Sequence, residues 1–239
     1  MSDQPIRCAF SDCEHCSARD NSFFFDLSPA EREEIAMNRV CRSYAKGEMI
    51  FYAEEAPSGL FCIHKGQVKI YKVGRDGREQ IVRLAGSGDI VGYRSLMSGE
   101  AYSAYAVPLE RAEICFIPKG VFFSVLSANP SLAQKMLTLI SRELREAEEK
   151  IVDLAQRPVS ERLAEALLML KETYGVERDM ATLNVRMTRI DLANIVGTAT
   201  ESVSRVLSKL KQEKIVDIHG RRIKIIDHPA LVARANIND

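Results

Sequence analysis

One uninterrupted helical segment separates two regions of different character in this chain. Asn129 and Pro130 form a favourable helix start, with Asn as the N-cap and Pro at the first helical position. Neither glycine nor proline follows until Pro158, which predicts a helix of about 28 residues, or roughly 42 Å at 1.5 Å per residue. Because this is longer than a small domain needs for its own core, we expect a chain of two domains.

The region before the long segment is rich in glycine and in short β-forming stretches. Nine glycines punctuate Ser43–Pro118, and short strands between regular glycine turns are typical of a small antiparallel barrel or jelly roll. The expected strands are Met49–Tyr52, Leu60–Ile63, Gln67–Val73, Gln80–Leu84 and Ala112–Ile117. Ahead of them, Ser28 and Pro29 predict the start of a short helix.

The long segment carries a narrow apolar seam. Apolar residues recur in alternating steps of three and four, as the a and d positions of a coiled coil do. They are Leu137, Ile140, Leu144, Ala147, Ile151 and Leu154. Charged residues fill the other faces, so the seam predicts a homodimer. The alternative is an amphipathic helix packed on its own barrel, because the seam lasts only about three heptads.

Composition limits the class of protein. Lys plus Arg equals Asp plus Glu at 33 each, so any attraction for nucleic acid must come from local charge. The longest apolar runs are shorter than the roughly 18 residues of a membrane-spanning helix, and Met1–Arg7 lacks an apolar signal core. We therefore expect a cytoplasmic protein without membrane contact. Six cysteines in that compartment point to metal or redox chemistry rather than to structural disulfides.

Two capping signals and one glycine mark a helix-turn-helix motif near the end of the chain. Thr188 and Asp191 stand in the order of a capping box at the start of the first helix. Gly197 can adopt the positive φ of the turn. Thr198 and Glu201 repeat the capping pattern at the start of the second helix.

The second helix of this motif has one polar face. Glu201, Ser204 and Arg205 share it at i, i+3 and i+4. The stripe expected to be buried is Val203, Val206, Leu207 and Leu210. Arg, Glu and Ser can each pair with base edges in the major groove, so we expect this face to bind DNA. The further predicted contacts are Thr188, Arg189 and Thr200. Alternatively, Glu201 only closes its capping box and Arg205 is a solvated helix residue.

Positive charge gathers around the motif. Between Arg186 and Lys224 nine basic residues stand against four acidic ones, a local excess of five positive charges. Ile215–Ile226 predicts a hairpin wing whose turn can contact phosphate. We therefore expect four parts. These are a cysteine-rich segment (1–27), a β-barrel sensory domain (28–128), a dimerisation helix (129–157) and a winged helix-turn-helix DNA-binding domain (158–239).

The order of these parts resembles the CRP/FNR family of bacterial transcription regulators over nearly the whole chain. Glu201-Ser-Val-Ser-Arg205 resembles the E-x-x-S-R recognition sequence of the FNR branch, whose half-site is TTGAT within an inverted repeat. The resemblance implies an α+β fold: an N-terminal cyclic-nucleotide-binding-like β jelly-roll barrel, a long dimerisation helix and a C-terminal winged helix-turn-helix. It also implies a regulator rather than an enzyme, with double-stranded DNA and RNA polymerase as partners, the polymerase through loops such as Gly74–Glu79.

The cyclic AMP site of the CRP branch is altered in this chain. That branch uses a Gly-Glu turn and an Arg-Ser pair in the barrel. Here Gly92-Tyr-Arg-Ser95 and Tyr102-Ser-Ala104 stand at the corresponding positions. Because a buried phosphate needs a cation such as that arginine, we do not expect cyclic AMP to bind.

The FNR branch instead implies an oxygen sensor, a four-iron cluster held by three N-terminal cysteines and one in the barrel. Cys115 matches the barrel ligand, whereas Cys8-x4-Cys13-x2-Cys16 departs from the family spacing and Ser22 stands near a usual ligand position. The predicted ligands of a 4Fe-4S cluster are Cys8, Cys13, Cys16 and Cys115. Loss of the cluster would then alter the dimer seam and so DNA binding.

Other sensing chemistries stay open. The same cysteines can hold zinc, form a thiol–disulfide switch or have no role, with His15 as a weak substitute ligand. Cys41 and Cys62 have the pattern of packing residues rather than of ligands. Haem-bound nitric oxide or a small ligand in the barrel are further possible signals. A cupin-type metalloenzyme is the remote alternative, because the four histidines form no His-x-His pair.

Overall fold

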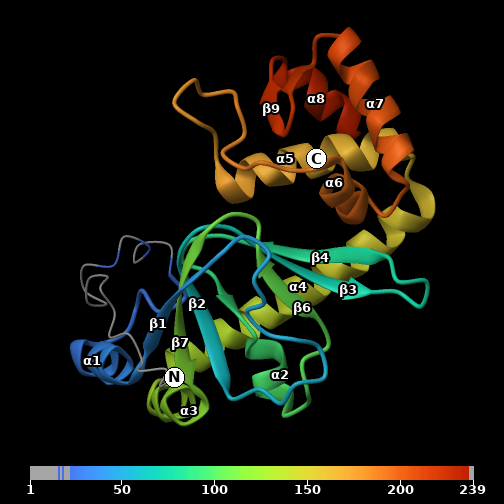
Figure 1. Ribbon diagram of the computed structural model, residues 1–239. Helices are drawn as coiled ribbons and strands as arrows, with labels where there is room; N and C mark the ends of the chain where they lie inside the picture. The colour runs from blue at the N-terminus through green and yellow to red at the C-terminus, as the bar shows by residue number, and fades with distance from the viewer. Residues whose placement is uncertain (1–15, 17, 19–21, 237–239) are drawn as a thin grey trace. The chain divides into compact units, whose positions relative to one another are not determined.

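The computed structural model describes Cys16, Ala18 and residues 22–236, which form two compact units (Figure 1). The first unit contains residues 1–72 and 83–144, and the second contains 73–82 and 145–239. The division falls inside α4 (Pro130–Gln156), so this helix contributes to both units. The predicted domain limits at 27, 128 and 157 stay predictions.

Two antiparallel sheets form the β domain, most of which belongs to the first unit, with strand orders β1-β7-β2-β5 and β4-β3-β6. Their bounds are β1 (Val40–Tyr44), β2 (Gly59–Lys65), β3 (Val68–Val73), β4 (Glu79–Ala85), β5 (Ile90–Val91), β6 (Tyr105–Pro108) and β7 (Ala112–Pro118). Apolar side chains such as Ile63, Ile70 and Ile114 fill the space between the sheets. The expected strand Met49–Tyr52 was wrong: it forms a single bridge, from Phe51 to Ala106.

Three shorter helices complete this unit: α1 (Pro29–Asn38), α2 (Tyr93–Ser98) and α3 (Lys119–Ala128). The helix predicted at Ser28 is confirmed, because Ser28 and Glu31 form a reciprocal capping box. Helices α1 and α3 lie side by side (Figure 1). Apolar residues of both, including Ile35 and Phe122, pack with residues of β2 and β7 in a second core outside the barrel.

Helix α4 has the predicted length and carries the seam on its surface. It spans 27 residues, and the Asn129 side-chain oxygen accepts a hydrogen bond from the Leu132 N–H at 2.9 Å. Leu137, Leu144 and Ile151 are 64%, 60% and 66% exposed. Ala147 and Leu154 are also exposed, whereas Ile140 is half-buried against the second core. Most of the seam therefore does not pack on the chain's own barrel.

One acidic residue of α4 is buried. Glu143 accepts a hydrogen bond from the Tyr93 hydroxyl, and its two carboxylate oxygens lie 2.9 Å from Arg83 Nε and 2.7 Å from Arg94 Nη2. Burial raises the pKa of Tyr93, so the hydroxyl keeps the proton it donates. This Glu143 cluster joins β4, α2 and α4.

The second unit is a helical domain with a hairpin. Helix α5 (Val159–Tyr174) ends at Gly175. It packs against α6 (Arg189–Val196), α7 (Thr200–Gln212) and α8 (His228–Ala235), while β8 (Val216–His219) pairs with β9 (Arg222–Ile225). Of the helices within the described residues, none is long and apolar enough to cross a membrane.

Candidate DNA-reading helix and cysteine cavity

Local hydrogen bonds fix the start of α6 and the turn that follows it. Thr188 Oγ1 donates to Asp191 Oδ2 at 2.6 Å, and the Asp191 N–H donates back to Thr188 Oγ1 at 3.0 Å. The predicted capping box is therefore confirmed. Gly197 ends the helix at φ 70°, where an added Cβ would also lie 2.6 Å from Leu154 Cδ2.

The second predicted capping box, Thr198 with Glu201, was wrong. Helix α7 begins one residue later than that pattern requires, with Ala199 as the N-cap and no side-chain cap. Glu201 is then the second residue of the helix rather than the third, so it does not occupy the capping-box position. Its side chain is exposed.

The buried stripe of α7 sets which residues face outward. Val203, Leu207 and Leu210 are buried as predicted, whereas Val206 is only half-buried. Glu201 and Arg205 are exposed, and Arg205 Nη2 lies 3.4 Å from Ser202 Oγ. Of the remaining predicted contacts, Thr188, Arg189, Thr200 and Ser204 are half-buried. The Ser204 hydroxyl donates to the Thr200 carbonyl at 2.9 Å, so this donor already has a partner within the helix.

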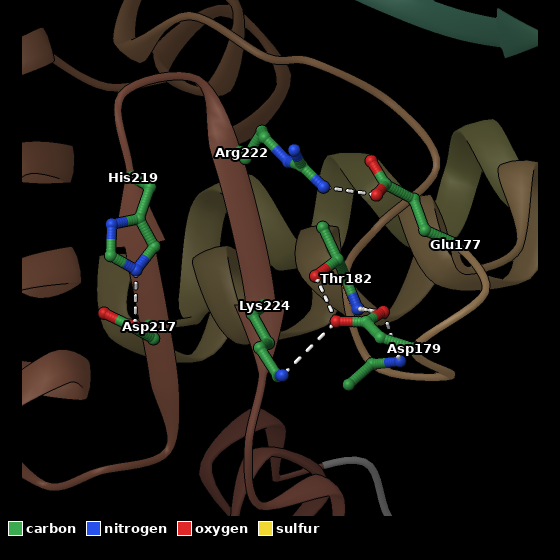
Figure 2. Close-up of polar contacts among 8 residues, drawn as sticks. Glu177, Asp179, Thr182, Asp217, His219, Arg222 and Lys224 are labelled. Carbon is green, nitrogen blue, oxygen red and sulfur yellow. Dashed lines mark hydrogen bonds and ion pairs between the residues drawn. The ribbon is translucent and has the colours of Figure 1, made fainter.

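The predicted wing is confirmed as the hairpin of β8 and β9, with Gly220 at φ 62° in its turn. Ion pairs occupy several of its charges (Figure 2). Asp217 lies 2.8 Å from Lys211 Nζ and 2.7 Å from His219 Nε2. The Lys211 ammonium, with the Ile218 N–H and His219, holds the pKa of Asp217 below its usual range.

Two cations of the wing are paired by acids from the loop before α6. Arg222 pairs with Glu177, and Lys224 Nζ lies 3.2 Å from Asp179 Oδ2 (Figure 2). Hydrogen bonds from the Thr182 N–H and hydroxyl lower the pKa of Asp179, so it stays ionised. The charge count missed these acids because they precede the stretch counted. Among the described residues, the cations that form no ion pair include Arg189, Arg205, Lys209 and Arg221.

A cavity of about 60 Å³ lies between α1 and the outer face of β2 and β7. Its polar and sulfur-bearing lining is Cys16, Ser22, Arg32, Arg39, Cys62, His64 and Cys115. The structure thus brings together two of the four predicted cluster ligands, Cys16 and Cys115. The other two, Cys8 and Cys13, lie outside the described residues. Cys62, expected to pack, is half-buried on the cavity wall.

The cavity has donors and charge that fit a metal–thiolate centre. Cys16 Sγ lies 3.1 Å from His64 Nδ1, and Arg32 Nε is buried without a hydrogen-bond partner among the described residues. A cation beside thiolates favours their ionised, metal-binding form. Within the described residues, no three His, Cys, Asp or Glu side chains are grouped to hold a metal ion. A centre here therefore needs a further ligand from outside the described residues, and Cys8 and Cys13 are the predicted ones.

The barrel residues at the positions of the cyclic AMP site of the CRP branch interact with other groups of this chain. Tyr102 is buried, stacks on Phe51 with ring centroids 4.3 Å apart, and donates to the Gly59 carbonyl at 3.2 Å. Burial raises the pKa of Tyr102 to about 12. Arg83 and Arg94, cations that could attract a phosphate, are both bound by Glu143.

Comparison with known proteins supports both halves of this description. The Cyclic nucleotide-binding domain family model matches residues 41–129, and the Crp-like helix-turn-helix domain model matches residues 161–234. The chain belongs to the CRP/FNR family of transcription regulators. It is therefore a DNA-binding regulator and not an enzyme.

Curated relatives of this CRP/FNR regulator match it almost end to end. It is 28% identical over 229 residues to the Fumarate and nitrate reduction regulatory protein of Vibrio cholerae, covering 95% of this chain and 91% of the relative. Electron transport regulator A of Shewanella oneidensis is 29% identical over 223 residues, covering 92% and 88%. The solved structure of FixK2 from Bradyrhizobium japonicum aligns with a TM-score of 0.76 at 26% identity, covering 84% of this chain and 99% of FixK2.

The capping role of Thr188 is testable. We expect Thr188→Ala to lower the free energy of unfolding by about 1 kcal/mol, because the Asp191 N–H loses its acceptor and the Asp191 carboxylate loses the hydrogen bond from the Thr188 hydroxyl. Thr188→Ser, which keeps the hydroxyl, should retain most of the stability. Urea unfolding followed by circular dichroism measures both. Unchanged stability with weakened DNA binding would instead make Thr188 a DNA contact.

Proposed function

We propose that this CRP/FNR regulator acts as a homodimer on TTGAT-type inverted repeats and senses oxygen or redox state through a cysteine-bound iron-sulfur cluster. The predicted ligands are Cys8, Cys13, Cys16 and Cys115. The observation that carries the sensing proposal is the cavity, because Cys16 and Cys115, from distant parts of the sequence, both line it together with Arg32, whose Nε is buried. The names of the Vibrio and Shewanella relatives, which refer to fumarate and nitrate reduction and to electron transport, support a redox signal.

Within this proposal the chain's residues have separate tasks. A bound cluster would supply a redox-active iron centre. Cys115 of β7 and Cys16 would be two of its ligands. Because α1 packs against α3 and both share a core with Leu132 and Met136 of α4, a change at the cavity is transmitted to the dimer helix by apolar contacts.

The cluster is tested by anaerobic purification. We expect a brown protein with broad absorption near about 400 nm that is bleached by air, and iron and sulfide in equal amounts. Cys115→Ser should lose the colour and the iron, while Cys62→Ser, on the neighbouring strand, should keep them.

Three outcomes would contradict the cluster. A sharp Soret band would indicate haem, and tightly bound zinc would indicate a structural thiolate site. A colourless protein that binds its DNA site normally would leave a thiol or a small ligand as the signal.

DNA recognition is proposed to depend on Glu201, Ser204 and Arg205. Arg205 carries the most direct argument, because its guanidinium is exposed on α7 and can donate to guanine O6 and N7. Glu201 can accept from a cytosine amine at the start of the helix. Ser204 contributes through its oxygen, since its hydrogen is directed to the Thr200 carbonyl.

Arg205→Ala should weaken binding to a TTGAT-type site by about 1–3 kcal/mol and leave binding to unrelated DNA nearly unchanged. Lys209→Ala, one turn further along α7, is the matched control and should weaken binding to both sequences alike. Fluorescence anisotropy at fixed salt measures all four affinities. If Arg205→Ala weakens binding to both DNAs equally, Arg205 contacts phosphate only and does not read bases.

The seam of α4 supports the homodimer. Leu137, Leu144 and Ile151 together expose a line of large apolar side chains that a second copy would cover. Two-fold symmetry would place two α7 helices at the two halves of an inverted repeat. RNA polymerase contact through Gly74–Glu79 stays a prediction; this turn carries an exposed ion pair between Asp76 and Arg78.

Ile151→Glu should convert the dimer to a monomer, because two buried carboxylates would face each other across the seam. Binding to the full inverted repeat should fall with it, while α-helical content stays unchanged. Glu148→Gln, an exposed change on the same helix, serves as the control. Analytical ultracentrifugation measures the oligomeric state, and a variant that stays dimeric would place the interface elsewhere.

A further inference from the structure

Helices α4 and α5 are joined by two residues only, Arg157 and Pro158. Pro158 is the N-cap of α5 and provides no side-chain cap. The Arg157 N–H donates to the Asp153 carbonyl at 3.0 Å and so continues the last turn of α4. Among the described residues no backbone hydrogen bond runs from α5 to α4, so the angle between the two helices is left to side chains.

The Arg157 side chain bridges three helices at this junction. Its Nη1 lies 3.2 Å from Asp153 Oδ1 of α4 and 2.5 Å from Glu165 Oε2 of α5. Its Nε lies 3.5 Å from Glu161 Oε2 of α5, and its Nη2 donates to the Ala235 carbonyl at the end of α8. All three guanidinium nitrogens thus have partners, and the side chain is only 19% exposed.

The groups around Arg157 depend on its charge and shape. Three carboxylates surround this one cation, and without it they would repel one another across the junction. The Ala235 carbonyl belongs to the last turn of α8, where carbonyls have no partner inside their own helix. A guanidinium directs its donors in a fixed plane, whereas a lysine ammonium is a compact point charge. Lysine could therefore not make all of these contacts at once.

A second set of contacts ties the end of α4 to the turn before α7. Leu154, a seam residue, packs so closely on Gly197 that an added Cβ there would lie 2.6 Å from Leu154 Cδ2. Arg162 of α5 donates from Nη1 to the neighbouring Val196 carbonyl at 2.7 Å. All of these residues belong to the second unit, which also contains α7. Within this unit, the end of the seam is therefore connected to the DNA-reading helix through packed side chains.

We propose that Arg157 is a positioning residue that sets the direction of α7 relative to the dimer seam. This role rests on the proposed homodimer, because the direction matters only when two α7 helices must reach two half-sites together. Once one half-site is bound, the second binds at an effective concentration that depends on how well the connection between the two readers holds the matching geometry. Arg157 supplies that geometry without contacting DNA.

The test uses the full-length protein and two DNA duplexes. One carries two inverted TTGAT half-sites centred one helical turn apart, and the other has one base pair inserted between them, which rotates one half-site by about 35° relative to the other. Fluorescence anisotropy at fixed salt gives both affinities and their ratio. We expect the wild type to bind the longer duplex at least roughly tenfold more weakly.

Arg157→Ala should bind the shorter duplex roughly tenfold more weakly than the wild type and distinguish little between the two spacings. Arg157→Lys, which keeps the charge but not the planar donors, should lie between them. Arg145→Ala removes an exposed ion pair with Glu149 on the same helix and is the matched control. Its ratio should equal that of the wild type.

Thermal unfolding and a duplex with a single half-site separate positioning from folding. If Arg157→Ala lowers Tm and weakens binding to all three duplexes alike, its spacing ratio is unchanged and the positioning role is overturned. If Arg157→Ala does not fold, Glu165→Gln decides, because it keeps the side-chain size and removes one charge beside Arg157. Its ratio should fall in the same direction, and an unchanged ratio overturns the role.

The wild type separates this role from the proposed dimer. If the wild type binds both spacings equally, the arrangement of two readers on two half-sites is rejected, and the role of Arg157 with it. If the wild type and Arg157→Ala are equally sensitive to the spacing, the positioning role alone is rejected and the dimer stands.

Discussion

The pairing of β7 with both β1 and β2 is the constraint on which the cavity depends. Along β7, Ala112 and Ile114 face the barrel core, while Cys115 and Ile117 face α1 and α3. Because the side-chain period of a strand is two, a slip of one residue would exchange these faces. Cys115 would enter the barrel and Ile114 would face the cavity. Burial of ordinary apolar residues therefore fixes the position of Cys115. The strand register then places it directly opposite Cys41 of β1 and Cys62 of β2.

At α7, too, core packing determines which side chains face outward. The buried Val203, Leu207 and Leu210 leave the helix one favourable rotation, since turning it would expose leucines and bury charge. Glu201 and Arg205 then point outward as a consequence of core packing. The Thr188–Asp191 box fixes the start of α6, and Gly197 ends that helix at positive φ, and neither uses the exposed face of α7. Stability and DNA recognition are thereby assigned to different residues of one short motif.

Signals that act between neighbours in sequence predicted the structure well. The caps at Ser28 and Thr188 depend on backbone groups only three residues away. The capping box predicted at Thr198 failed because α7 starts one residue later, after Ala199, whose side chain offers no acceptor for a helix N–H. Cross-strand neighbours could not be predicted from the sequence, because no short-range pattern relates Cys41 to Cys115. The burial of Glu143 could not be predicted for a similar reason. Only its contacts with Arg83 and Arg94 distinguish it from the other charged residues of α4.

Glu143 also explains why a barrel of this family need not accept a phosphate. A buried carboxylate is tolerated only while cations and donors satisfy it, and here Arg83, Arg94 and Tyr93 do so. A phosphate that took the two arginines would leave Glu143 buried without them, at a cost of about 3–5 kcal/mol. The same cluster resists sliding of α4 along the β domain, which apolar contacts at Leu132 and Met136 alone would permit. Since Leu144 of the exposed seam is the next residue, the Glu143 cluster ties this part of the seam to β4 and α2.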